Sequence, residues 1–131
     1  MILIALYGNL AAGKTSVARH LEQEHGFFYV QLETPRMVEF EEVQRGLPRL
    51  TAANWRGAVV DSIQSDAQAE ALHAAGGRIW YIVRPRRADP AVPGIVQRAG
   101  DRGILNLEGA FSDTRKHVDC VLQQLESRLT S

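Results

Sequence analysis

The 131-residue chain carries a formal net charge of zero, with 45% hydrophobic and 23% charged residues. This size and composition predict a single domain, residues 1–131, and the neutral balance excludes a global electrostatic attraction to nucleic acid or membranes. A lone cysteine, the absence of a leader sequence and the absence of an apolar run of about 18 residues predict a cytoplasmic protein that has no internal disulfide and makes no membrane contact.

Predicted strands and helices alternate along the chain. Apolar runs typical of buried strands occur at Ile2–Tyr7, Phe27–Leu32, 58–60, Ile79–Val83 and Ile104–Leu107. Helices are predicted from the first glycine-rich turn to Gly26, from Arg36 to Arg45, after Asp61 to about Ala75, and from a cap at Ser112 onward. This order predicts an α/β fold in which about five parallel strands form a sheet with helices on both faces.

Two segments are predicted to lack long regular elements. Gly46 and Pro48 should end the second helix, so 47–55 should be irregular or a short helix. Residues 84–103 contain three prolines and three glycines and should form a loop with room for one short helix. Three further side chains are predicted to pack in the core: Trp55, Trp80 and Cys120.

The turn after the first predicted strand has the spacing of a phosphate-binding loop. It reads Gly8-Asn9-Leu10-Ala11-Ala12-Gly13-Lys14-Thr15, and the strand before it and the helix after it agree with the motif. The residues predicted to bind a nucleotide are Gly8, Asn9, Ala11, Ala12, Gly13, Lys14, Thr15 and Ser16. Lys14 suits the β- and γ-phosphates, the Thr15 hydroxyl suits Mg²⁺, and Ser16 fits equally well as an ordinary first-turn residue. ATP and Mg²⁺ are therefore the predicted cofactors.

Acidic residues follow two of the predicted strands. Asp61 ends the third strand, where a P-loop protein can place an acid that holds the Mg²⁺ shell or acts on an acceptor hydroxyl. A helix cap or a turn aspartate is the alternative for this residue. Glu33 and Arg36 follow the second strand, where an acceptor could dock, unless they form a charged turn around Pro35. Thr15 and Asp61 are the predicted metal ligands, and Asp61 and Glu33 are the candidates for the general base.

Arginines gather after the fourth predicted strand. They are Arg84, Arg86, Arg87, Arg98 and Arg102. A guanidinium group can cover the charge on a transferred phosphoryl group, and Arg84 is the first candidate for that role. The alternative is solvated surface charge. The four histidines have no metal-ligand spacing with any Cys or His partner: His20, His25, His73 and His117.

Three stretches carry a family resemblance. They are Ile2–Leu21 with the phosphate-binding loop, 59–85 with an acid-ended strand, a helix closing in Gly-Gly and a strand closing in Arg-Pro, and Ile104–Leu125 with the last strand and helix. In this order they resemble the P-loop nucleotide kinases, and most of all the deoxynucleoside monophosphate kinase-like proteins of bacteriophages. The resemblance implies a three-layer P-loop kinase fold, transfer of a phosphoryl group from ATP with Mg²⁺, and a location in the host cytoplasm.

Departures from that family concern the acceptor. Its members usually carry an arginine for the acceptor nucleotide two residues after the strand aspartate, where this chain has Ile63. The chain also has little material for a lid, which kinases of free monophosphates use to exclude water. These absences favour the related phage kinases that phosphorylate the hydroxymethyl group of 5-hydroxymethyldeoxyuridine within DNA, after the base has left the stack.

Three other functions stay open. A kinase of free deoxynucleoside monophosphates is the runner-up. An ATPase or switch without an acceptor is a more distant alternative, as is an inactive nucleotide-binding module. The oligomeric state and the preference for ATP or GTP are not determined by the sequence.

Overall fold

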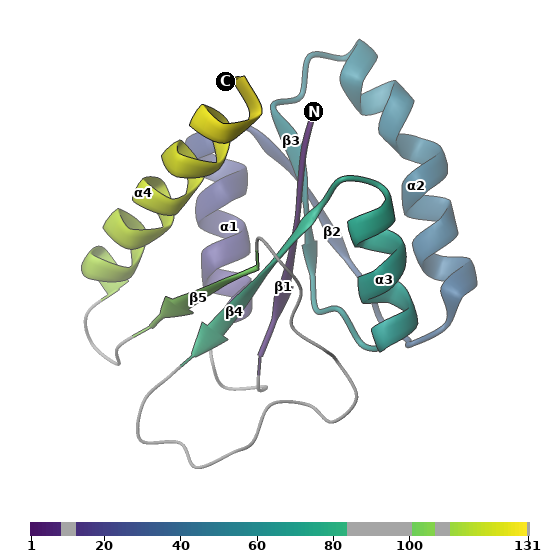
Figure 1. Cartoon of the computed structure of the whole chain (residues 1–131), viewed down its shortest axis with the longest axis horizontal. Coiled ribbons are helices and arrows are strands. Elements are labelled where there is room, and N and C mark those ends of the chain that lie inside the picture. Colours follow the sequence, from purple (N-terminus) through teal and green to yellow (C-terminus); the bar gives the residue numbers. More distant parts are fainter. Residues whose placement is uncertain (9–12, 84–100, 107–110, 131) are drawn as a thin grey trace.

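Apolar runs of the chain form the strands of one five-stranded parallel sheet (Figure 1). This computed structural model describes residues 1–8, 13–83, 101–106 and 111–130. The strands are β1 (Ile2–Tyr7), β2 (Phe27–Gln31), β3 (Gly57–Asp61), β4 (Arg78–Val83) and β5 (Arg102–Leu105). Their order in the sheet is β2-β3-β1-β4-β5, with every neighbouring pair parallel. The first strand of the chain therefore lies at the centre.

Helices cover both faces of this sheet. The described helices are α1 (Lys14–His25), α2 (Met37–Ala52), α3 (Asp66–Ala74) and α4 (Phe111–Thr130). α1 and α4 lie on one face, and α2 and α3 lie on the other (Figure 1). The predicted three-layer α/β fold with a five-stranded parallel sheet is confirmed. Among the described helices, none has both the length and the apolar character that a membrane span needs.

The side chains of β1 alternate between two hydrophobic cores. Ile4 and Leu6 pack with α1 and α4, whereas Leu3, Ala5 and Tyr7 pack with α2 and α3. Successive residues of a strand point to opposite faces of its sheet, so a strand covered on both faces must be apolar throughout. The continuous apolar run at the start of the sequence is thus explained by its central place.

The second helix is longer than the sequence predicts. α2 continues through Gly46 and Pro48 to Ala52 rather than ending at Arg45, so the segment 47–55 is mostly helical. A proline inside a helix costs about 3 kcal/mol, because it removes a hydrogen bond and crowds the preceding turn. Apolar side chains at helical spacing offset this cost by packing against the core on this face of the sheet: Phe40, Val43, Leu47 and Leu50.

Two boundaries near the C-terminus also differ from the prediction. The last strand is Arg102–Leu105 rather than Ile104–Leu107, because its register follows β4, with Arg102 beside Trp80 and Leu105 beside Val83. α4 begins at Phe111, so Ser112 lies inside its first turn and is not its N-cap. The arginine predicted in the long loop at position 102 therefore belongs to a strand.

One of the three side chains predicted for the core is buried. Trp80 on β4 is 1% exposed, as predicted. Trp55 is 38% exposed, because it follows the end of α2 outside both cores, where its ring meets the edge of Phe28. Cys120 is exposed as well, since it lies on the side of α4 turned away from the sheet.

Replacement of Gly57 by alanine should destabilise this fold. Gly57 opens β3 between β1 and β2, and a Cβ atom there would lie 2.3 Å from the Ile2 carbonyl oxygen and 2.7 Å from the Phe27 ring. The Ile2 carbonyl is sheet backbone and cannot give way freely. We expect Gly57→Ala to lower the free energy of unfolding in urea by about 1–3 kcal/mol.

Gly46→Ala is the matched control for this substitution. Apart from its chain neighbours and the backbone of α2, no described atom lies within 4 Å of the Cβ position at Gly46. Alanine also favours a helix by up to about 1 kcal/mol over glycine. Gly46→Ala should therefore be neutral or stabilising. Wild-type stability of Gly57→Ala would contradict the packing described for β3.

Candidate active site

The candidate site lies where the strand order of the sheet reverses. β1 connects through α1 to β2 on one side, whereas β3 connects through α3 to β4 on the other side of β1. In parallel sheets the carboxyl ends of the strands at such a reversal form a crevice for ligands. Leu6 of β1 pairs with Asp61 of β3. The turn that starts at Gly8 therefore begins beside Asp61.

Lys14 begins α1 and turns back toward the strand before it. Gly13 has a φ of 88°, a left-handed conformation that glycine adopts without a steric penalty, and it lets the chain enter the helix directly from the turn. Lys14 Nζ donates a hydrogen bond of 2.6 Å to the Gly8 carbonyl oxygen. Burial lowers the pKa of Lys14, and the nearby charge of Asp61 opposes that shift. The ammonium group thus lies against the start of the predicted phosphate-binding loop.

Asp61 is the buried acid of the site. The residue is 1% exposed. Its Oδ2 accepts hydrogen bonds from the Thr15 hydroxyl at 2.9 Å and the Tyr29 hydroxyl at 2.6 Å, and its Oδ1 accepts one from the Ser62 hydroxyl at 3.2 Å. Removal of a carboxylate from water is unfavourable unless donors replace the water. These hydroxyls supply that replacement, and they join β3 to α1 and β2.

The backbone turns sharply just after Asp61. Ser62 has a φ of 73°, a left-handed conformation that is unfavourable by roughly 1–2 kcal/mol for a residue other than glycine. The Ile63 N–H then donates to the Leu6 carbonyl oxygen at 3.0 Å, and the Ile63 side chain is 4% exposed in the core. The turn leaves Asp61 at the crevice and points the Ile63 side chain into the protein interior.

Two side chains of this site were not predicted from the sequence. Tyr29 on β2 donates to Asp61, and the guanidinium carbon of Arg19 lies 4.1 Å from the centre of the Tyr29 ring. Burial, the hydrogen bond to Asp61 and the charge of Asp61 raise the pKa of Tyr29 to about 12, so its hydroxyl remains a donor at neutral pH. Helical spacing could have indicated Arg19, which follows Thr15 by four residues. The role of Tyr29 depends on the pairing of β2 with β3, which is not a local property of the sequence.

A cavity of about 300 Å³ opens beside Thr15, between α1 and the start of α4. Ser16 and Arg19 line it from α1, and Phe111 and Arg115 line it from α4. The Arg115 guanidinium carbon lies 5.7 Å from the centre of the Phe111 ring. An aromatic ring and cationic groups next to Thr15 can bind the base and phosphates of a nucleotide.

The remaining predicted residues have varied positions. Ser16 is exposed and lines the cavity. Glu33 is exposed, and its backbone N–H donates to the carboxylate of Glu39, which also accepts hydrogen bonds from Thr34. Arg102 donates to Gln124 of α4 at 2.9 Å. Several predicted residues lie outside the described ones: Asn9, Leu10, Ala11, Ala12, Arg84, Arg86, Arg87 and Arg98.

The donor atoms of Thr15 and Asp61 fit Mg²⁺. This ion binds oxygen ligands at 2.0–2.1 Å in an octahedron, so neighbouring ligands lie about 2.9 Å apart. Thr15 Oγ1 and Asp61 Oδ2 are 2.9 Å apart. A carboxylate and a hydroxyl can therefore hold Mg²⁺ once the Thr15 hydrogen turns away from Asp61, with water and phosphate oxygens as the other ligands.

Comparison with known proteins identifies the fold. A sugar kinase from Janibacter sp. HTCC2649, in unliganded form, matches with a TM-score of 0.66 and 9% identity over 94% of this chain and 95% of its own. A gluconokinase from Sinorhizobium meliloti 1021 matches with a TM-score of 0.60 and 14% identity over 98% of this chain and 95% of its own. No family model and no curated protein match the sequence. The chain has the α/β fold of these kinases, in agreement with the predicted fold.

Neutralisation of Asp61 should lower the pKa of Tyr29. A phenolate at Tyr29 would lie beside the Asp61 carboxylate, which repels it and also binds the protonated hydroxyl. In Asp61→Asn we expect the pKa of Tyr29 to fall from about 12 toward its ordinary value of 10. The measurement is the tyrosinate absorbance as pH rises, taken as the difference between each protein and its Tyr29→Phe counterpart. Asp113→Asn on α4 is the control, and an unchanged pKa in Asp61→Asn would contradict the contact.

Proposed function

We propose that the protein is a phosphotransferase that uses a nucleoside triphosphate with Mg²⁺ to phosphorylate a hydroxyl group. The observation that carries this proposal is the contact between Thr15 and the buried Asp61, beside Lys14, where β1 and β3 end. A phosphate-binding turn alone needs only backbone N–H groups and a lysine. A carboxylate next to the Thr15 hydroxyl adds the means to bind a metal and to accept a proton. The kinases that share the fold support the same class of reaction.

Each residue of the site has a task in the proposed transfer. Lys14 leaves the Gly8 carbonyl and binds β- and γ-phosphate oxygens at the positive end of α1. Thr15 and Asp61 would hold Mg²⁺, which when bound draws charge from the phosphate oxygens. The acceptor oxygen forms its bond to the γ-phosphorus as the bond to the nucleoside diphosphate oxygen breaks.

The acceptor proton and the moving phosphoryl group need further partners. The hydroxyl proton goes to Asp61 or Glu33, the acids that follow β3 and β2. Arg84 follows β4 directly in the chain. We assign to it the role of neutralising the negative charge on the transferred phosphoryl group. Position and electrostatics supply most of the rate in such reactions, because the protein forms no covalent bond to the phosphate.

Two observations favour a hydroxyl acceptor over a free nucleoside monophosphate. Ile63, where related phage kinases carry an arginine for the acceptor nucleotide, is buried in the core. The carboxylates of Asp61 and Glu33 can accept a hydroxyl proton, but they would repel a second phosphate group. A free monophosphate acceptor is therefore the runner-up.

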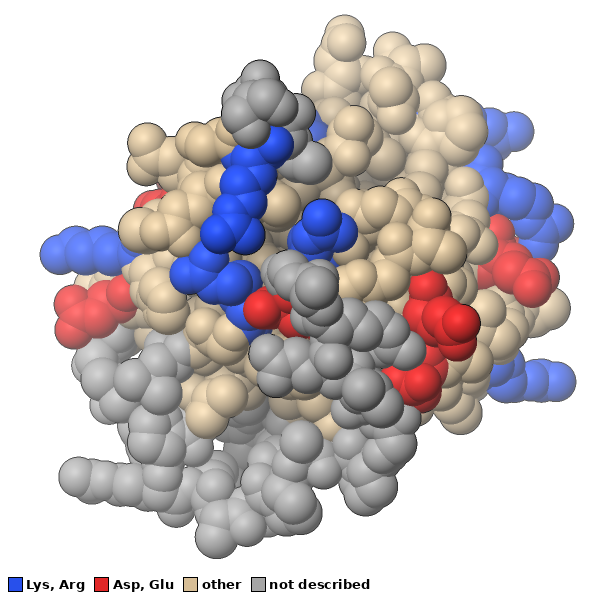
Figure 2. Space-filling view, viewed as in Figure 1, with Lys and Arg blue, Asp and Glu red and all other residues tan. Residues whose placement is uncertain are grey.

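The hydroxyl belongs to one of two acceptor classes. The sequence resemblance points to the hydroxymethyl group of 5-hydroxymethyldeoxyuridine in phage DNA, a step in thymidine hypermodification. The fold neighbours, a sugar kinase and a gluconokinase, point to a sugar or a sugar acid. On the face drawn in Figure 2, the described basic side chains form a narrow row and separate groups, with acidic side chains among them. DNA binding favours a broad basic surface, and the described side chains on this face do not form one.

A labelling experiment should identify the acceptor class. The protein would be incubated with γ-labelled ATP, Mg²⁺ and one of three acceptor sets: sugars and sugar acids, DNA with or without 5-hydroxymethyluracil, and free deoxynucleoside monophosphates. We expect label in the sugar set or in the modified DNA only. Label in a free monophosphate would overturn the proposal of a hydroxyl acceptor. Hydrolysis of ATP at the same rate with every acceptor, and with no label transferred, would indicate an ATPase or a switch.

Lys14→Ala should remove most of the transfer activity and leave the fold intact. Loss of one cation from the developing charge of a transition state lowers the rate by about 100-fold or more. The chain's other lysine offers a matched control, since Lys116 is exposed on α4. We therefore expect Lys116→Ala to transfer phosphate at the wild-type rate. Undiminished phosphate transfer by a folded Lys14→Ala protein would contradict the assignment of Lys14 to the active site.

A further inference from the structure

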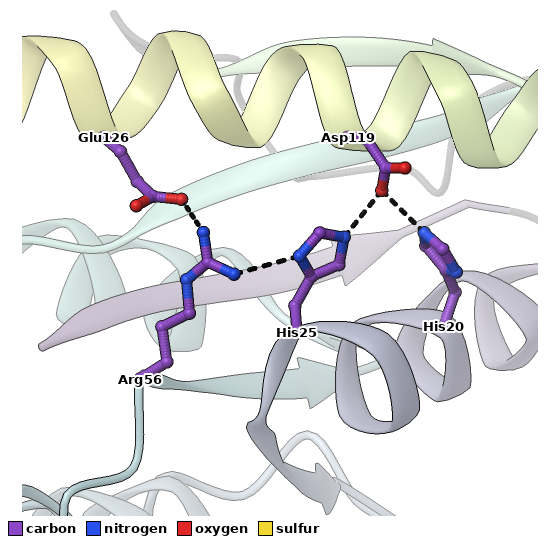
Figure 3. Close-up of polar contacts among 5 residues, drawn as sticks. All are labelled: His20, His25, Arg56, Asp119 and Glu126. Atoms are coloured by element: carbon purple, nitrogen blue, oxygen red, sulfur yellow. Dashed lines mark hydrogen bonds and ion pairs between the residues drawn. The ribbon is translucent and has the colours of Figure 1, made fainter.

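Two histidines of α1 and an aspartate of α4 meet in a cluster that plays no part in the proposed transfer. Their side chains converge in Figure 3. His20 Nε2 lies 2.7 Å from Asp119 Oδ1, and His25 Nε2 lies 2.6 Å from the same oxygen. His20 and His25 are five residues apart on one helix, and Asp119 follows His25 by 94 residues. The fold therefore creates this cluster, which explains why histidine spacing did not reveal it.

The cluster is half sheltered and has access to solvent. The His20 side chain is 7% exposed and the Asp119 side chain is 47% exposed. An open cavity of about 550 Å³ borders His25 and Asp119 and is also lined by Arg56 and Glu126. A small ligand can reach His25 and Asp119 from this cavity, and the buried His20 side chain lies on the inner side of the cluster.

Arg56 determines where the His25 proton lies. Arg56 Nη1 lies 3.0 Å from His25 Nδ1, and its Nη2 donates to Glu126. A guanidinium group can only donate hydrogen bonds, so His25 Nδ1 is the acceptor and His25 Nε2 carries the proton that Asp119 accepts. The cluster is thus a set of hydrogen bonds that joins α1 to α4 (Figure 3).

We propose that His20, His25 and Asp119 form a binding site for one divalent transition-metal ion of the Zn²⁺ class. The donor set of two imidazole nitrogens and one carboxylate oxygen matches the preference of Zn²⁺, whereas Mg²⁺ prefers oxygen ligands. The donor atoms all lie within 4.8 Å of one another. Water from the adjoining cavity supplies the fourth ligand of a tetrahedron.

The geometry requires only a small adjustment. Zn²⁺ binds nitrogen and carboxylate oxygen at about 2.0–2.2 Å, which places neighbouring ligands of a tetrahedron about 3.3 Å apart. The nitrogen-to-oxygen distances of 2.6 and 2.7 Å are those of hydrogen bonds, so the ligands must separate by roughly 0.6 Å as the ion replaces the shared protons. Rotation of the half-exposed Asp119 side chain can provide this shift.

Arg56 opposes metal binding at this site. An imidazole that binds metal through Nε2 carries its proton on Nδ1, and on His25 that proton would face another donor, the Arg56 guanidinium. The positive charge of Arg56 also disfavours a nearby cation. Arg56 must therefore release His25 and keep its contact with Glu126 when the ion binds. Arg56 thus sets the affinity of the site without serving as a ligand.

Titration of the full-length protein with Co²⁺ tests this proposal. Co²⁺ replaces Zn²⁺ in tetrahedral sites and has visible absorption bands, and excess Mg²⁺ in the buffer occupies oxygen-rich sites such as Thr15 and Asp61. We expect one equivalent of Co²⁺ to give a tetrahedral spectrum that Zn²⁺ abolishes. His25→Asn and Asp119→Asn alter side chains that are not fully buried, and each should weaken binding at least about tenfold. Arg56→Ala should tighten binding by about tenfold, because it removes one unit charge next to the ion.

Two variants are matched controls. His73 Nε2 lies 2.7 Å from Asp101 Oδ1 but forms no described cluster of three ligands, so His73→Asn should bind Co²⁺ as the wild type does. Cys120 follows Asp119 and is exposed, so an unchanged spectrum in Cys120→Ser excludes a thiolate ligand. Absence of saturable binding, or wild-type affinity for Co²⁺ in Asp119→Asn, would overturn the site. Weaker binding by Arg56→Ala would overturn the role given to Arg56.

Discussion

The hydrogen bonds that Asp61 accepts connect the parts of the candidate site. A carboxylate at the buried end of a strand is unfavourable unless donors take the place of water. The Thr15 and Tyr29 hydroxyls supply this compensation from α1 and β2, and their bonds fix both elements against β3. The start of α1, and with it Lys14, is thereby oriented by an acid that lies 46 residues away from Thr15 in the chain. The geometry of the candidate site thus depends on one buried carboxylate.

Local patterns of the sequence predicted the parts of the fold that depend on local chemistry. β1 and α1 follow directly from an apolar run, glycine positions and helical spacing. The prediction failed at α2, because Pro48 is a strong local signal that the packing of the whole helix outweighs. Tyr29 and the pairing of the α1 histidines with Asp119 were not predictable for a different reason. Both depend on contacts between distant segments, which only the strand order and the helix packing define.

Polar side chains at the start of α1 bond to other parts of the candidate site. Lys14 is bonded to Gly8, and the Thr15 hydroxyl is bonded to Asp61. In the proposed reaction a triphosphate with its metal would exchange these bonds for new ones, and only the difference between the two sets would contribute to affinity. Phosphate alone would engage Lys14, whereas the metal–nucleotide complex would engage Thr15 and Asp61 as well.

The central position of β1 has a consequence for how the chain folds. Ile2 pairs with Gly57 and Ile4 pairs with Arg78, so the first strand to be synthesised cannot find either partner until much later residues have left the ribosome. Until then the most apolar segment of the protein is unpaired on both edges. Such long-range parallel pairing slows folding and exposes strand edges to other chains. The topology therefore leaves the edges of β1 open to other chains until β3 and β4 can pair with them.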